Sequence, residues 1–257
     1  MKYLLLIFLL PFITFAQDDD LDKLPYNDTP PQEARPTYFA IAVGYTANFA
    51  FLNVKEINDL LASDKFQIDK LNSQITLHGG GGFTGFPIWK NVRLGLFSTS
   101  GTRSSEIFSE DNVKKQSNLQ LSMSGLHFDY GYVIAKNLAL LGGLGLGYGR
   151  MKLEILQSVG QYEWDDINQI PDAENFNLSL EHKFLFVQPN ISIEWAATNF
   201  LMIRGNVQYN LTFDNFLSSD AGSWTMNGLT EVMNTPGSLT ANNFSAQVGL
   251  FIGLFNY

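Results

Sequence analysis

In the segment Trp195-Ala196-Ala197-Thr198-Asn199-Phe200-Leu201-Met202-Ile203, an aromatic residue precedes a very short polar turn, and an alternating segment follows directly. The same pattern occurs at residues 86–94 and 132–140, and each of the three turns ends in Asn. Tight turns that join alternating segments make antiparallel hairpins. Long polar segments separate the hairpins, so the sequence predicts short turns at one end of the fold and long loops at the other.

On both sides of these turns and elsewhere in the chain, a period of two between apolar and polar side chains marks eight strands. They cover residues 37–50, 73–86, 91–104, 117–133, 138–155, 183–196, 201–214 and 243–257. In the strand 117–133 the apolar phase switches near Gly125, which predicts a one-residue bulge. The strand 138–155 alternates leucine with glycine, so we expect its glycines to relieve crowding inside a closed sheet. A count of ten strands stays open as the alternative.

The four remaining segments, residues 51–72, 105–116, 156–182 and 215–242, are the predicted long loops. The first contains a short amphipathic helical pattern from Val54 to Ser63, with Ile57, Leu60 and Leu61 on one side. We expect this helix to cap the mouth of the barrel. A helix that lies at the membrane interface or binds a partner is the alternative.

The N-terminus has the features of an export signal. Lys2 precedes an apolar run from Leu4 to Phe15, and Ala16 offers a small-residue cleavage site before acidic residues. About a dozen apolar residues are too few for a spanning helix, which needs ~20. Residues 1–16 are therefore predicted to be a signal peptide rather than a retained anchor, and the proline-rich acidic residues 17–36 a flexible periplasmic leader.

Composition fits this class and excludes others. The chain has 22 Gly, 21 Phe and 10 Tyr, as expected where small residues let a barrel close and aromatic girdles mark both membrane interfaces. The formal charge of −9 argues against nucleic acid as a partner, because such binding needs clustered Lys or Arg. The absence of Cys excludes disulfides, thiolate metal sites and lipoprotein acylation.

The predicted fold is all-β: an eight-stranded antiparallel up-and-down transmembrane barrel, with short periplasmic turns, longer extracellular loops and both termini in the periplasm. Residues 37–257 resemble the small OmpA/OmpX-type outer-membrane barrels and, more loosely, the PorT-like barrels of Bacteroidetes. The resemblance rests on the topology, the hairpin turns and the closing strand from Gln247 to Tyr257. It implies an integral outer-membrane protein in contact with membrane lipid and lipopolysaccharide, inserted by the barrel-assembly machinery. A further envelope protein partner is left open.

In barrels of this class the last strand ends in aromatic residues that the assembly machinery reads. Phe251, Phe255 and Tyr257 resemble that signal, but the predicted lipid face contains Ile252 and Leu254. The aromatic residues therefore fall on the opposite parity. Either the strand bulges near its end or the signal is weaker than the resemblance suggests.

Polar residues that alternate with the lipid face should point into the lumen, since charged groups facing hydrocarbon are costly. Glu194 and Arg204 flank Asn199 symmetrically, so antiparallel pairing places them opposite each other as an inward ion pair. The other predicted lumen residues are Arg93, Gln188, Asn190, Asn206, Gln208 and Gln247. The main interpretation is a satisfied polar core, and the alternative is a gated or proton-conducting lumen.

Three histidines permit hypotheses of catalysis like that of the small lipid-modifying barrels. His78 and the pair His127 and Asp129 are weak candidates, because no Ser is placed to complete a nucleophile. No two His have a metal-ligand spacing, so neither a metal nor a cofactor is predicted. The acidic side chains around Trp164 could bind a divalent cation, but a solvated loop is preferred.

The sequence therefore favours a non-enzymatic integral barrel with a role in envelope structure, surface interaction or export assembly. An outer-membrane lipid-modifying enzyme and a narrow transporter of small or apolar solutes are the alternatives. We expect no wide channel, because eight strands enclose only enough space for side chains.

Overall fold

A computed structural model describes residues 38–86, 88–110, 113–160, 175–214 and 224–256. The predicted signal peptide, the leader and the acidic loop around Trp164 lie outside the described residues. Within those ranges no helix has the length and apolar character needed to cross a bilayer.

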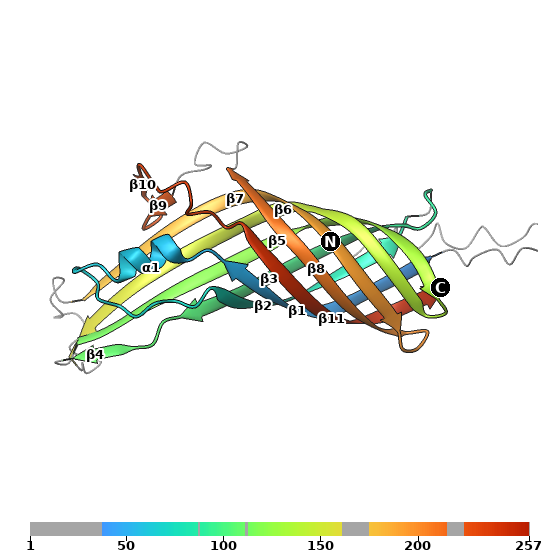
Figure 1. The fold of residues 1–257 in the computed structure, drawn as a ribbon, viewed down its shortest axis with the longest axis horizontal. Coiled ribbons are helices and arrows are strands. Elements are labelled where there is room, and N and C mark those ends of the chain that lie inside the picture. The colour runs from blue at the N-terminus through green and yellow to red at the C-terminus, as the bar shows by residue number, and fades with distance from the viewer. Residues whose placement is uncertain (1–37, 87, 111–112, 161–174, 215–223, 257) are drawn as a thin grey trace, which may run out of the picture. The chain divides into compact units, whose positions relative to one another are not determined.

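Eight antiparallel strands form a closed ring, as the sequence predicted (Figure 1). Each ring strand pairs with the next ring strand in chain order, and the last ring strand pairs with the first. This ring therefore has no free edge. The ring strands are β1 (Phe39–Leu52), β2 (Gln74–Gly85), β3 (Val92–Ser104), β5 (Val113–Ala135), β6 (Leu138–Val159), β7 (Phe176–Ala196), β8 (Leu201–Asp214) and β11 (Asn243–Asn256).

The predicted loops contain additional short elements. The first holds the helix α1 (Lys55–Leu61), shorter than the predicted pattern. Three short strands also lie in the predicted loops: β4 (Phe108–Glu110) pairs with β5, and β9 (Trp224–Met226) pairs with both β7 and β10 (Thr230–Val232). The loop between β6 and β7 is shorter than predicted, because both strands extend into it.

The three short turns reverse the chain in two ways. Asn91 and Asn137 each adopt a left-handed backbone with φ of 65°, which Asn tolerates better than most residues. In the third turn it is Thr198 that fixes the geometry, since its hydroxyl accepts hydrogen bonds from the backbone N–H groups of Phe200 and Leu201. The turns at this end of the barrel are thus formed by left-handed Asn residues and by hydrogen bonds to a Thr hydroxyl.

Large apolar side chains cover the outside of the ring and form a surface that we call the apolar belt. The alternation predicted for residues 201–214 is confirmed: Ile203, Val207 and Phe213 are exposed, whereas Arg204 and Asn206 are buried. The belt consists of Phe39, Ile41, Val43, Tyr45, Leu96, Leu126, Phe128, Tyr130, Tyr132, Leu140, Leu144, Leu146, Tyr148, Ile191, Ile193, Trp195, Ile203, Val207, Tyr209, Leu211, Phe213, Phe244, Val248, Leu250, Ile252 and Leu254.

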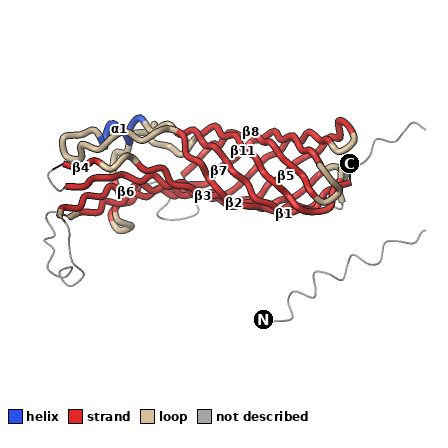
Figure 2. The backbone as a smooth tube through the Cα atoms, turned by 90° about the horizontal axis from the view of Figure 1, so that it is seen from below, coloured by secondary structure: helices blue, strands red, loops and turns tan. Residues whose placement is uncertain are grey.

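Strands β5, β6 and β7 extend beyond the ring at the long-loop end (Figures 1 and 2). They contain 23, 22 and 21 residues, whereas the other ring strands have 12 to 14. In this extension the apolar side chains face inward and the polar ones outward. Leu119, Leu121 and Met123 are fully buried, whereas Gln120 and Ser122 lie on the outer face.

This inversion corrects the predicted bulge near Gly125. The pairing of β5 with β3 and with β6 runs through Gly125 without a shift, and the one irregularity on β5 lies between Val133 and Ala135. The apolar phase changes because the apolar side chains lie on the exposed outer face in the belt and in a buried hydrophobic core in the extension. A continuous strand therefore mimics the sequence pattern of a bulge.

The core of the extension is closed by α1 and the segment that follows it. Ile57 and Leu61 of α1 are buried in one cluster with Leu121 of β5 and Leu153 of β6. Leu60, which the sequence placed on the same side, is 37% exposed. The expected cap over the barrel mouth is thus confirmed, with Leu60 at its rim.

The inward glycines of β6 make room for side chains of its neighbours. A Cβ atom at Gly147 would collide with the ring of Phe186, and one at Gly149 with the ring of Phe184. At Gly143 it would collide with the carboxylate of Asp129. The predicted steric role of these glycines is confirmed, with Phe184 and Phe186 as the bulky groups that cross the lumen.

Candidate functional site: a charged cluster inside the barrel

Arg93 on β3 is the centre of a buried charged cluster in the ring. It is 1% exposed, and its guanidinium ion-pairs with Asp129 of β5 at 2.8 Å and with Glu194 of β7. Its Nη1 also donates a hydrogen bond to the Tyr38 hydroxyl at 3.0 Å. One arginine therefore ties the start of β1 to three other strands across the lumen.

The predicted pair of Glu194 and Arg204 is confirmed. The two residues are directly opposite in the pairing of β7 with β8, and Arg204 Nε donates to Glu194 Oε1 at 2.7 Å. Tyr38 donates to the other carboxylate oxygen at 2.8 Å. Glu194 is fully buried and bridges both arginines, so two carboxylates and two guanidinium groups balance each other.

Aromatic rings fill the space around the two arginines. The ring of Phe83 lies 4.3 Å from the guanidinium carbon of Arg93 and 4.5 Å from that of Arg204, and Phe251 approaches Arg204 at 4.4 Å. Cations over ring faces gain electrostatic attraction, most when water is excluded. The cluster is thus packed as well as paired.

This geometry also resolves the parity of the last strand. Phe251 and Phe255 are inward and buried, and β11 keeps its register with β1 from Asn243 to Asn256 without a bulge. Ile252 and Leu254 are exposed in the belt. Among the described residues, Phe251 and Phe255 of the closing strand therefore face the lumen, and Tyr257 lies outside the described part of the chain.

A ladder of neutral polar groups continues from the charged cluster toward the long-loop end. Asn190 donates to Asp129 at 3.3 Å, and Asn206 donates to Ser192 at 2.7 Å. Further along, Gln188 donates to Asn210, which donates to Asn243. Gln208 is buried opposite Asn190, in the register that the sequence predicted, and Gln247 lines the small cavity described next.

The lumen beside this cluster contains a cavity of about 20 Å³, lined by residues that include Phe97, His127, Asp129 and Arg204. Such a volume holds about one water molecule. The ring is therefore filled by side chains.

The histidine candidates do not come together. His127 faces the lumen, where its ring packs against Phe97 with centroids 4.2 Å apart, two residues from Asp129. His78 lies on the outer face beside the Tyr45 hydroxyl. Asp129 is held by Arg93 rather than by a histidine. Within the described residues, no group of three or more His, Asp or Glu side chains could hold a metal ion.

Sequence reasoning missed the extent of this site. Arg93 was predicted to be a lumen residue but not the partner of Glu194, and Asp129 was named only with His127 as a weak catalytic candidate. Tyr38 was not named, although it shares the parity of the inward residues Ala40 and Ala42. That parity was the signal that could have identified it.

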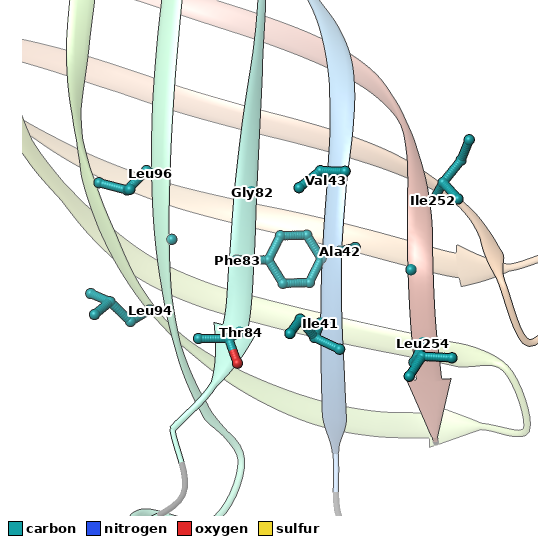
Figure 3. A pocket seen from close by; sticks show the side chains of 12 residues that line it. Ile41, Ala42, Val43, Gly82, Phe83, Thr84, Leu94, Leu96, Ile252 and Leu254 are labelled. Atoms are coloured by element: carbon teal, nitrogen blue, oxygen red, sulfur yellow. The ribbon is translucent and has the colours of Figure 1, made fainter. Parts of the chain in front are cut away.

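The outer face carries an apolar groove of about 730 Å³ over β2 (Figure 3). Its walls include Ile41 and Val43 of β1, Leu94 and Leu96 of β3, and Leu254 of β11, and none of its lining residues is charged. The groove exists because β2 presents glycine toward the outside at position 82. The groove is therefore a recess in the belt, and its lining is apolar.

No protein-family model matches the sequence, and a search of curated proteins found no match. Solved structures are similar in fold at low sequence identity. A major outer membrane protein from Thermus thermophilus aligns at 7% identity with a TM-score of 0.42, covering 83% of this chain and 99% of that one. The attachment invasion locus protein Ail of Yersinia pestis aligns at 10% identity and 0.35, covering 86% and 99%. The outer membrane protein OprG from Pseudomonas aeruginosa aligns at 11% identity and 0.35, covering 86% and 95%. In fold, the chain is similar to small outer-membrane β-barrel proteins.

Proposed function

We propose that this chain is an integral outer-membrane barrel with a non-enzymatic scaffold role in envelope structure, surface interaction or export assembly. The observation that carries the proposal is the combination of an apolar outer surface with a sealed, charge-balanced interior. A water-soluble protein would cover such a belt, because large contiguous apolar surfaces are rare on soluble monomers.

The outer surface supports membrane insertion. The belt runs around the ring, and the groove over Gly82 is open to the outside and lined by apolar side chains, so hydrocarbon can fill it. Closure of the ring leaves no backbone edge in contact with lipid, as a spanning sheet requires.

The interior favours a scaffold over a transporter. Arg93, Glu194 and Arg204 join opposite walls of the ring, and the cavity beside them holds about one water. The hydrophobic core of the extension closes the long-loop end above them. Two successive barriers, one ionic and one apolar, therefore oppose solute passage.

The proposed orientation places the short turns in the periplasm and the long-loop end outside. Strand β1 begins at the short-turn end and strand β11 ends there, which supports periplasmic termini. The proposed contacts are membrane lipid and lipopolysaccharide around the belt, the barrel-assembly machinery during insertion, and an envelope protein of unidentified chemistry. A catalytic role is not proposed, because His78 and His127 face opposite sides of the barrel wall.

The proposal is tested by cell fractionation combined with electrophoresis. The protein should sediment with the outer membrane, and the unheated sample should migrate differently from the boiled one in mild detergent, as a closed barrel that resists unfolding does. Recovery in the soluble periplasm would overturn it.

A further inference from the structure

The outer face of the extension changes from apolar to cationic in a single step along two neighbouring strands. Tyr148 of β6, the belt residue nearest to the extension on this strand, pairs with the partly exposed Leu185 of β7. The next outward positions, two residues further, are Arg150 and Lys183, which also pair with each other. Two strand residues span ~7 Å along the strand, or roughly 5 Å along the membrane normal at a tilt of 35–45°.

Arg150 and Lys183 are a like-charge pair directly across two strands, an arrangement that destabilises a sheet unless something neutralises it. Their side chains are 43% and 48% exposed. Glu181 is shared between them, at 3.8 Å from Arg150 and 3.5 Å from Lys183. These distances exceed the 2.7–2.9 Å of a charge-assisted hydrogen bond. Both cations therefore keep donors that are not engaged by Glu181.

Two neutral outward side chains of β5 add hydrogen-bond donors beside these cations. Ser122 of β5 is opposite Arg150 in the same row, and Gln120 is opposite Lys152 in the row above. Lys152 pairs with Glu154 at 2.6 Å. Three cations and two carboxylates leave this patch with a net positive charge, although the whole chain carries −9.

We propose that Arg150 and Lys183 bind the phosphate group of a membrane lipid headgroup in the outer leaflet, while its acyl chains lie on the belt beside Tyr148. The inference rests on the proposed membrane insertion and orientation. Arginine matches phosphate in bidentate geometry and lysine acts as a point charge, so the pair provides both. An acidic protein loop would not need the belt directly beneath the cations, and this continuity favours lipid.

The test uses the full mature chain, folded in detergent, and native mass spectrometry of bound lipid. The probe is lipid A carrying two phosphates, compared with the same lipid after removal of both phosphates. Arg150→Gln with Lys183→Gln should weaken binding of the phosphorylated probe about 20- to 30-fold, because each cation near an anionic lipid contributes about fivefold. Glu181→Gln should strengthen it, since the competing carboxylate is removed.

Lys90→Gln with Lys136→Gln removes two exposed cations at the short-turn end and should leave binding unchanged. Equal binding of the phosphorylated and dephosphorylated probes, or an unchanged affinity in the Arg150 and Lys183 variant, would overturn the proposal. Displacement of the lipid by millimolar inorganic phosphate would assign the site to free phosphate and overturn the lipid assignment. Loss of heat-modifiable migration in the wild-type protein would instead contradict the proposed membrane barrel itself, so the two failures are distinguishable.

Discussion

Glu194→Gln tests the charged cluster most sharply, because the wild-type carboxylate neutralises two arginines. Its side chain is fully buried, and that of Arg204 is 9% exposed. Removing one partner of a buried pair costs about 3–5 kcal/mol, since a desolvated charge is left behind. After the substitution Arg93 still has Asp129 at 2.8 Å, whereas Arg204 has lost the carboxylate that it contacts at 2.7 Å.

Adding Arg204→Met removes the stranded charge and keeps apolar contact with the rings of Phe83 and Phe251. We expect the double variant to be destabilised by only about 1–2 kcal/mol, so it should be more stable than Glu194→Gln alone by about 2–3 kcal/mol. Urea unfolding in detergent micelles, followed by tryptophan fluorescence, measures all four free energies of unfolding.

The control is Glu154→Gln, which removes a partly exposed ion pair with Lys152 and should cost less than about 1 kcal/mol. Additive losses for Glu194→Gln and Arg204→Met, with a coupling below about 0.5 kcal/mol, would refute the reasoning.

Two further predictions concern the wall and the orientation of the barrel. Gly147→Ala should destabilise the protein by about 1–3 kcal/mol because its Cβ would meet the ring of Phe186, whereas Gly142→Ala, which meets nothing within 4 Å, should have little effect on the same unfolding curves. In intact cells a membrane-impermeant maleimide should label Leu229→Cys, which lies at the long-loop end and is 90% exposed, but not Lys136→Cys at a short turn; the reverse pattern would contradict the proposed orientation. The chain has no native Cys to complicate labelling.

The ring strands could be predicted from the sequence because an apolar outer face on a closed sheet imposes a period of two. Inside the belt, most outward positions are apolar and most inward positions are polar or small, so both the strands and their faces can be read from alternation. The pairing register of two strands could also be predicted where a short turn joins them. The symmetry about Asn199 placed Glu194 opposite Arg204 and Ser192 opposite Asn206, and the structure confirms both pairs.

The extension could not be predicted in the same way, because there the apolar side chains face inward instead of outward. Leu119 and Leu121 are apolar because they face a covered core, whereas Leu126 and Phe128 are apolar because they lie in the belt. A period of two gives no information about which face of a strand is exposed to water. The strand ends near residues 113, 159 and 176 were therefore missed.

The contacts of Arg93 at the centre of the charged cluster were not predicted, for a related reason. Arg93 and Asp129 face each other across two strands joined by one of the predicted long loops, and the prediction used register only at the short turns. The centre of that loop lies midway between the two residues, so the same symmetry argument would have paired them. The contact between Arg93 and Glu194 crosses the lumen between non-neighbouring strands, and alternation carries no information about such contacts.

Single-channel recording in a planar bilayer tests most directly whether the barrel is a sealed scaffold. The charged cluster, the single-water cavity and the apolar core of the extension predict that the purified full-length protein gives no stable open-channel current, at most rare small events when the lumen pairs separate. A steady porin-like conductance from heat-modifiable, folded protein would contradict the account.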